Sequence, residues 1–155
     1  MVIPMPQDRH PPAPENWLIR QGTTDDVRAL VELDAYADTH AHRRVFIHDA
    51  VVSQRCLVAV TAGECAGYLV LTADFFCYDF IALVVIAPKH QRQGVALRLL
   101  AGAEGLCKTP KLFASTNDSN LASQALLAKA GFVASGRIEN LDEHDPELVY
   151  VKFIS

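Results

Sequence analysis

Residues 84–100, with the sequence VVIAPKHQRQGVALRLL, are the stretch around which the chain is organised. A β-branched apolar run ends at Pro88, a short polar turn follows, and Gly94 opens a new segment. Apolar residues recur in this segment at helical spacing, at Val95, Leu99, Ala103 and Leu106. The pattern predicts a strand, a turn and then an amphipathic helix.

The predicted turn carries little side-chain bulk, because Gly94 has no side chain and Ala96 has only a methyl group. Main-chain N–H groups at the start of the helix therefore stay exposed, at the positive end of the helix dipole. Such donors form an anion site suited to a phosphate or pyrophosphate. A Walker loop would need Lys and Ser or Thr after the glycine, and a dinucleotide fingerprint would need three glycines, so neither fits. A simple tight turn is the remaining alternative.

The spacing Gln91-x-x-Gly94-x-Ala96 after a strand resembles the pyrophosphate-binding motif of the GNAT superfamily, the acyl-CoA-dependent N-acyltransferases. Leu-Val-Val-x-x-Pro precedes this motif, and Asn120 with Ala-Gly-Phe at residues 130–132 follows it. The resemblance extends from Trp17 to the C-terminus.

This resemblance implies a mixed α/β fold. It predicts a mostly antiparallel sheet of about seven strands with flanking helices. A V-shaped splay is expected between the strands that end near Ile86 and Thr116. The hydrophobic pattern predicts strands at 17–20, 56–60, 65–71, 78–86, 111–116, 132–138 and 147–154, a turn at 72–74, and helices after Thr23, over 36–53, after Gly94 and from Asn120 to Ala130.

Residues 1–16 contain five prolines and lack the apolar core of a signal peptide, so they are expected to form a flexible arm before a domain at 17–155. The chain has a net charge of −4 at pH 7 and a pI near 5.8, which argues against nucleic-acid binding and favours cationic or amine substrates. No apolar run is long enough to span a bilayer. Together these features predict a cytoplasmic protein.

The four cysteines lack Cys-x-x-Cys spacing and are expected to be small buried thiols, without a disulfide framework. His40 and His42 would point to different faces of a helix, so a metal site is not expected. Aromatic residues gather before the central strand, as core residues or alternatively as a wall of the acceptor site. They are Phe75, Phe76, Tyr78 and Phe80.

The resemblance implies acetyl-CoA as cosubstrate, with pantetheine along the strand at 84–86 and pyrophosphate in the turn at 91–96. A main-chain N–H near Val85 would polarise the acyl carbonyl. Asn120 would contact the cosubstrate or simply cap its helix. The predicted binding residues are Val84, Val85, Ile86, Gln91, Arg92, Gln93, Gly94, Val95, Ala96 and Asn120.

The catalytic groups are less directly indicated. The tyrosine that the family often uses to protonate the leaving thiolate is replaced by Leu127. Tyr150 is the predicted substitute, with Tyr78 or water as alternatives. Asp79 is the predicted base, although Phe80 could take the inward position instead. Glu139, Asp142 and His144 are the other candidates for the base.

The sequence therefore predicts an N-acetyltransferase that moves an acetyl group from acetyl-CoA to an amine of a small molecule, peptide or protein, by direct attack in a ternary complex. No metal, nucleic-acid or membrane partner is expected. The absence of the usual tyrosine at Leu127 supports an alternative, a non-catalytic acyl-CoA-binding module. The resemblance also allows a homodimer through the C-terminal strand.

Overall fold

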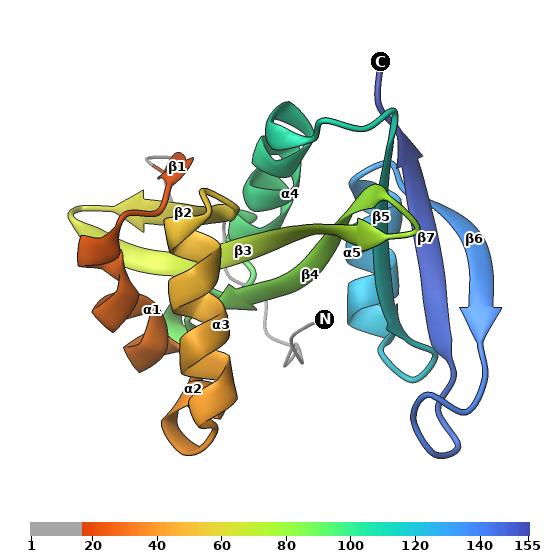
Figure 1. The fold of residues 1–155 in the computed structure, drawn as a ribbon, viewed down its shortest axis with the longest axis horizontal. Helices are drawn as coiled ribbons and strands as arrows, with labels where there is room; N and C mark the ends of the chain where they lie inside the picture. Colours follow the sequence, from red (N-terminus) through yellow and green to blue (C-terminus); the bar gives the residue numbers. More distant parts are fainter. Residues whose placement is uncertain (1–16) are drawn as a thin grey trace.

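One seven-stranded sheet in the order β1-β2-β3-β4-β5-β7-β6 runs through the protein (Figure 1). The computed structural model describes residues 17–155, so the arm predicted at 1–16 lies outside the described residues. The strands are β1 (Leu18–Gln21), β2 (Cys56–Thr61), β3 (Glu64–Phe75), β4 (Tyr78–Ile86), β5 (Lys111–Asn117), β6 (Val133–Ile138) and β7 (Glu147–Phe153). All neighbours are antiparallel except β4 and β5, which confirms the predicted mixed α/β fold.

Helices cover the two faces of this sheet differently. One face, which we call the α3 face, carries η1 (Thr24–Asp26), α1 (Val27–Leu33), α2 (Ala35–Thr39) and α3 (Ala41–Val52), and Figure 1 shows α3 in front of β2 and β3. The opposite face, the α4 face, carries α4 (Val95–Leu106) and α5 (Leu121–Lys129). Each face has its own apolar cluster, centred on Leu30 and Ile47 on the α3 face and on Leu99 and Leu127 on the α4 face.

The parallel pair β4 and β5 is hydrogen-bonded over only three residues. Asp79–Ile81 pair with Leu112–Ala114, and beyond this point the two strands diverge. The diverging part of β4, residues 82–86, remains paired with β3 on its other side. This arrangement confirms the predicted splay between the strands that end near Ile86 and Thr116, and among the described strands it leaves one edge of β4 without a partner (Figure 1).

Two predicted boundaries were wrong. The helix expected over 36–53 is broken at His40, whose backbone is extended (φ −127°, ψ 97°). Side chains rather than a continuing helix satisfy the last carbonyls of α2, because the His40 ring bonds to the Tyr36 carbonyl and Arg44 donates to the Ala37 carbonyl. The turn expected at 72–74 belongs to β3, which extends to Phe75. The reversal lies at Phe76 and Cys77, both with positive φ, because Phe75 packs against Phe80 and Phe113 and keeps the strand paired.

The prediction of buried thiols holds for Cys56 and is wrong for Cys77, which is exposed in the turn between β3 and β4. Burial raises the pKa of the Cys56 thiol to about 12. In the described residues no three or more histidine, cysteine or acidic side chains are grouped so that they could hold a metal ion. Within 17–155, no helix combines the length and hydropathy that a membrane span requires.

Candidate functional site

The turn between β4 and α4 has an unusual backbone. Arg92 and Gly94 both have positive φ, 64° and 81°. A methyl group added at Gly94 would meet none of the described atoms within 4 Å, so the turn is open on that side. Backbone N–H groups in such alternating conformations converge into a concave anion site. The turn that holds the residues predicted to wrap a pyrophosphate is therefore open at Gly94, and binding of a pyrophosphate there stays a prediction.

The first turn of α4 adds donors to this cradle. The first i to i−4 hydrogen bond of α4 runs from Arg98 N–H to the Gly94 carbonyl. No side chain of the described residues caps the helix at Gly94. The N–H groups of Val95, Ala96 and Leu97 precede Arg98, the first helical donor, and point out of the helix end. They lie at the positive end of the helix dipole, which favours an anion there.

Side chains hold the turn in shape. Gln91 Nε2 donates to the Ile86 carbonyl at 3.4 Å, and Gln93 Nε2 donates to the Lys89 carbonyl at 3.3 Å. Lys89 also pairs with Glu64 on β3. The two glutamines are thus tied to the protein's own backbone. Anion binding at this turn would rest on main-chain N–H groups and on the nearby positive charges, rather than on glutamine side chains.

The open edge of β4 presents specific main-chain groups to the splay. Ala87 N–H donates to the Ala66 carbonyl, toward β3. Successive residues alternate in direction, so Val85 also points its N–H toward β3, and the N–H groups of Val84 and Ile86 point toward β5. Of the main-chain N–H groups near Val85, those of Val84 and Ile86 are therefore the ones directed at the splay, and their role toward an acyl carbonyl stays a prediction. Gln91 already occupies the Ile86 carbonyl on this side.

Thr116 lies on the β5 wall of the splay and was not singled out by the sequence analysis. Its side chain is fully buried and faces the α4 face, in alternation with Leu112 and Ala114. Its Oγ1 has no hydrogen-bond partner in the described structure. A buried hydroxyl without a partner is destabilising, by about 1–3 kcal/mol. An orphan group of this kind beside the splay fits a polar ligand placed between β4 and β5.

Asn120 stands at the N-terminus of α5. Its Oδ1 accepts a hydrogen bond from Ser123 N–H at 3.1 Å, so the capping role is present. Helices α4 and α5 each follow a strand of the parallel pair, and their N-termini therefore lie at the same edge of the sheet. This edge is where ligands bind in open α/β sheets. Contact between Asn120 and a cosubstrate stays a prediction.

Asp79 lies at the paired end of β4 and is 3% exposed. Its Oδ2 accepts a hydrogen bond from Lys108 N–H at 2.6 Å, and its Oδ1 lies 3.5 Å from Arg55 Nη1. Burial raises the pKa of this carboxyl, but the Lys108 N–H and the Arg55 charge outweigh it and keep the pKa below its ordinary value. Both oxygens have protein partners, which explain the burial without a catalytic role. That role stays a prediction.

Tyr150 is 9% exposed and packs on the α4 face, in one cluster with Ala114, Leu127 and Phe132. Leu127 is fully buried there, so the position of the family's tyrosine is filled by aliphatic packing. Tyr78 lies on the other face, with its ring 5.5 Å from that of Phe113. The structure thus places the two candidate tyrosines on opposite faces of the sheet. Only Tyr150 shares the face of the helix N-termini.

The alternative bases lie on the loop between β6 and β7. Glu139 and His144 are exposed, and Asp142 accepts a hydrogen bond from Asn117 Nδ2 at 2.7 Å. The first residue of β7, Glu147, was read only as the start of a strand, yet it is 8% exposed. The low exposure of Glu147 distinguishes it from the other acids of this loop, and exposure cannot be read from the sequence.

Comparison with known proteins gives a consistent result. The model of the acetyltransferase (GNAT) family matches residues 14–132. A GNAT-family acetyltransferase structure from Bacillus cereus is 30% identical, with a TM-score of 0.86 over 91% of this chain and 99% of that chain. No curated protein matches.

Two more distant structures were solved with acetyl-CoA. The first is yncA of Salmonella typhimurium, a proposed acetyltransferase, at 19% identity and a TM-score of 0.73 over 91% of this chain and 95% of that chain. The second is a proposed streptothricin acetyltransferase of Bacillus anthracis, at 18% identity and a TM-score of 0.72 over 91% of this chain and 100% of that chain. At these identities the likeness is one of fold.

Proposed function

Because the chain belongs to the acetyltransferase (GNAT) family, we propose that it transfers the acetyl group of acetyl-CoA to an amine of a small molecule, peptide or protein. The amine nitrogen attacks the thioester carbonyl carbon in a ternary complex. A C–N bond forms and the C–S bond breaks, so that the CoA thiolate leaves. The proton lost from the nitrogen passes to a base, and protonation of the thiolate gives free CoA beside the acetamide. The observation that supports this most directly is the open turn at Gly94, next to the splayed strands.

The chain's own groups divide this work. Main-chain N–H groups at 93–96, with the charge of Arg92, would hold the pyrophosphate. The unpaired edge of β4 would pair with pantetheine amides, much as a strand adds to a sheet edge. Thr116 Oγ1 supplies a buried hydroxyl on the opposite wall. The N–H of Val84 or Ile86 would stabilise the negative charge that develops on the carbonyl oxygen.

The acid and the base are proposed more narrowly. Tyr150 would donate a proton to the departing sulfur, since its hydroxyl makes no hydrogen bond within the described residues and it faces the same side as α4 and α5. Asp79 would act as base only if its bonds to Lys108 and Arg55 were exchanged for substrate. A thiol has a pKa near 8.5, so its thiolate can leave without full protonation. Replacing Tyr150 should therefore slow turnover without abolishing it.

A thermal-shift titration with acetyl-CoA and with CoA tests the cosubstrate. At a hundredfold excess over its Kd the ligand adds about 2.7 kcal/mol, which raises the Tm of a domain of this size by about 5–10 °C. Gly94→Glu fills and charges the turn and should lose this shift. Gly105→Glu is the matched control, because Gly105 is exposed on the same helix with no described atom within 4 Å of an added methyl group. No shift in the wild type at millimolar ligand would refute the proposal.

The buried Leu127 favours one second candidate, an acyl-CoA-binding module without turnover. Release of free thiol from acetyl-CoA over a panel of amines separates the two. If thiol is released with any amine, and the rate of release falls in Tyr150→Phe, the protein is not a binding module without turnover. Tight acetyl-CoA binding without thiol release from any amine would support it.

A further inference from the structure

Glu147 is a buried carboxylate that the proposed chemistry has not used. It opens β7, opposite Asn117 on β5 and Ile138 on β6, and is 8% exposed. Leu148 and Tyr150 face the α4 face, so Glu147 faces the α3 face. Within 17–155, no hydrogen bond or ion pair reaches its carboxylate. A largely buried carboxylate without a protein partner is a candidate to pair with a cationic ligand.

The carboxylate is nevertheless open to a ligand. Among the described residues, the fully buried side-chain atoms without a hydrogen-bond partner are His90 Nε2 and Thr116 Oγ1, and neither oxygen of Glu147 is one of them. The small exposed part of Glu147 therefore includes its polar end. The amide of Asn117, its neighbour on β5, is occupied, because Nδ2 donates to Asp142 Oδ2 and to the Asp145 carbonyl. No donor of this neighbour remains for the carboxylate.

The surroundings of Glu147 are acidic. The adjoining loop carries Glu139, Asp142, Glu143 and Asp145. The nearby cation Arg137 is already engaged with Glu139, and lies 3.9 Å from Asp118. A cluster of one sign attracts the opposite charge toward the site. The field at Glu147 thus favours a cation and disfavours an anionic acceptor.

Glu147 lies beside the splay rather than at a remote edge. Its partner Asn117 comes three residues after Ala114, the last β5 residue that pairs with β4. Adjacent strands are about 4.8 Å apart, so β7 lies about 10 Å or more from the line of β4. A cation held by the carboxylate would therefore lie on the β7 side of β5, about 10 Å or more from the β4 edge, on the face opposite α4 and α5.

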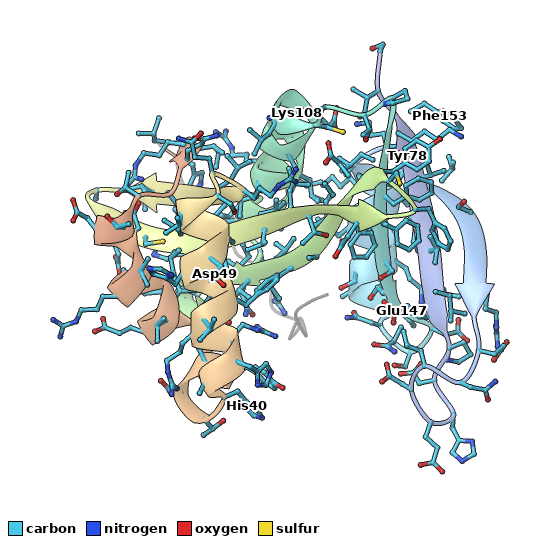
Figure 2. All side chains as sticks on the ribbon, in the orientation of Figure 1. His40, Asp49, Tyr78, Lys108, Glu147 and Phe153 are labelled. Carbon is cyan, nitrogen blue, oxygen red and sulfur yellow. The ribbon has the colours of Figure 1, made fainter. Side chains whose placement is uncertain are left out.

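An apolar strip leads away from Glu147 along the same face. Val149 and Val151 alternate with it on β7, and Phe113 lies opposite Val151 on β5. The Phe75 ring lies 4.9 Å from that of Phe80 and 5.0 Å from that of Phe113. Figure 2 shows Glu147 toward one end of β7, with Tyr78 and Phe153 toward the other. Val149 and Val151 are buried, at 7% exposure each, whereas the rings of Phe75, Phe80 and Phe113 are half-buried. These rings are therefore the part of the strip suited to a short hydrocarbon or aromatic body attached to the cation.

We propose that Glu147 binds an ammonium group of the acceptor on the α3 face. This ammonium is distinct from the neutral nitrogen that attacks the thioester, and an apolar body joins the two. This proposal rests on the proposed acetyl transfer. It assigns the cosubstrate to the helix N-termini and the non-reacting ammonium of the acceptor to the carboxylate, on different sides of the sheet. Glu147 is thus a specificity-determining residue.

Phenethylamine is the probe, measured by calorimetric titration into the protein saturated with acetyl-CoA analogue or CoA. Its uncharged counterpart 2-phenylethanol should bind at least about tenfold more weakly to the wild type. Glu147→Gln should weaken phenethylamine binding by about tenfold or more, and leave the Kd for CoA within about twofold. Glu143→Gln is the matched control, since that acid is exposed on the same loop, and it should leave both constants unchanged.

Each outcome decides. Equal binding of phenethylamine and 2-phenylethanol by the wild type would overturn the proposal without any variant, so a misfolded Glu147→Gln cannot hide a failure. No binding of phenethylamine to CoA-loaded protein, or unchanged binding in Glu147→Gln, would also overturn it. Failure of CoA itself to bind would instead refute the proposed function. The two failures are thereby distinguished.

Discussion

Replacing Gly94 by alanine isolates the contribution of backbone conformation at the turn. Gly94 has a φ of 81°, which costs an L residue about 1–2 kcal/mol. No described atom lies within 4 Å of an added methyl group, so no clash adds to this strain. If the turn keeps its shape, the free energy of unfolding falls by that amount and Tm falls by about 2–8 °C.

The same strain can appear in binding instead. If the turn of Gly94→Ala relaxes when the protein is free, acetyl-CoA must restore it, and 1–2 kcal/mol becomes a loss of affinity of about 5- to 30-fold. Stability and affinity are therefore measured together, by thermal denaturation and by calorimetric titration. Gly105→Ala is the control, because Gly105 lies inside α4, where alanine should raise stability by about 0.5–1 kcal/mol. A Gly94→Ala protein with wild-type Tm and wild-type affinity would refute the assignment of the turn.

Three further outcomes follow from other contacts. Asp26→Asn should lower the free energy of unfolding at pH 7 by about 1 kcal/mol. The hydrogen bond from half-exposed Arg20 lowers the pKa of Asp26 from 3.8 to about 2, and solvent screens the pair. The difference in stability between the variant and the wild type should therefore close as the pH falls from about 4 to 2, and a pH-independent difference in urea titrations would contradict this. Cys77 should react with a thiol reagent in the native protein, whereas Cys56, with a raised pKa and no exposure, should react only on unfolding; equal rates would contradict it. Thr116→Val should raise Tm, since it removes a buried hydroxyl without a partner, and should weaken acetyl-CoA binding; a lower Tm would show that the hydroxyl is satisfied in the free protein.

The two faces of the sheet carry different chemistry. The α4 face brings together the turn, the helix N-termini, Thr116 and Tyr150, all suited to an anionic cosubstrate with a thioester. The α3 face presents Glu147 and the aromatic strip beyond the same splay. The β4–β5 pairing ends at Ile81 and Ala114, and the sheet is interrupted beyond that point. In the proposed reaction, the attacking nitrogen would meet the acyl group at this interruption.

The sequence by itself determined the strand, turn and helix around Gly94, and through them the family and the sheet. Local chemistry fixes these elements, because a β-branched run, a proline and a glycine constrain only their own backbone. The same local logic gave the cap at Asn120. It failed where long-range packing decided, as at Phe75, which is held in β3 by Phe80 and Phe113.

Only the tertiary structure decided which acids and hydroxyls lack partners. Asp79 is satisfied by Lys108 and Arg55, groups that lie far from it in the chain, whereas Glu147 has no partner within 17–155. Partnership depends on distances between segments, which no periodicity in the sequence encodes. Burial destabilises a charge unless a nearby protein group or a ligand pairs with it. Those distances therefore decide whether a polar side chain is held within the protein or is available to bind a ligand.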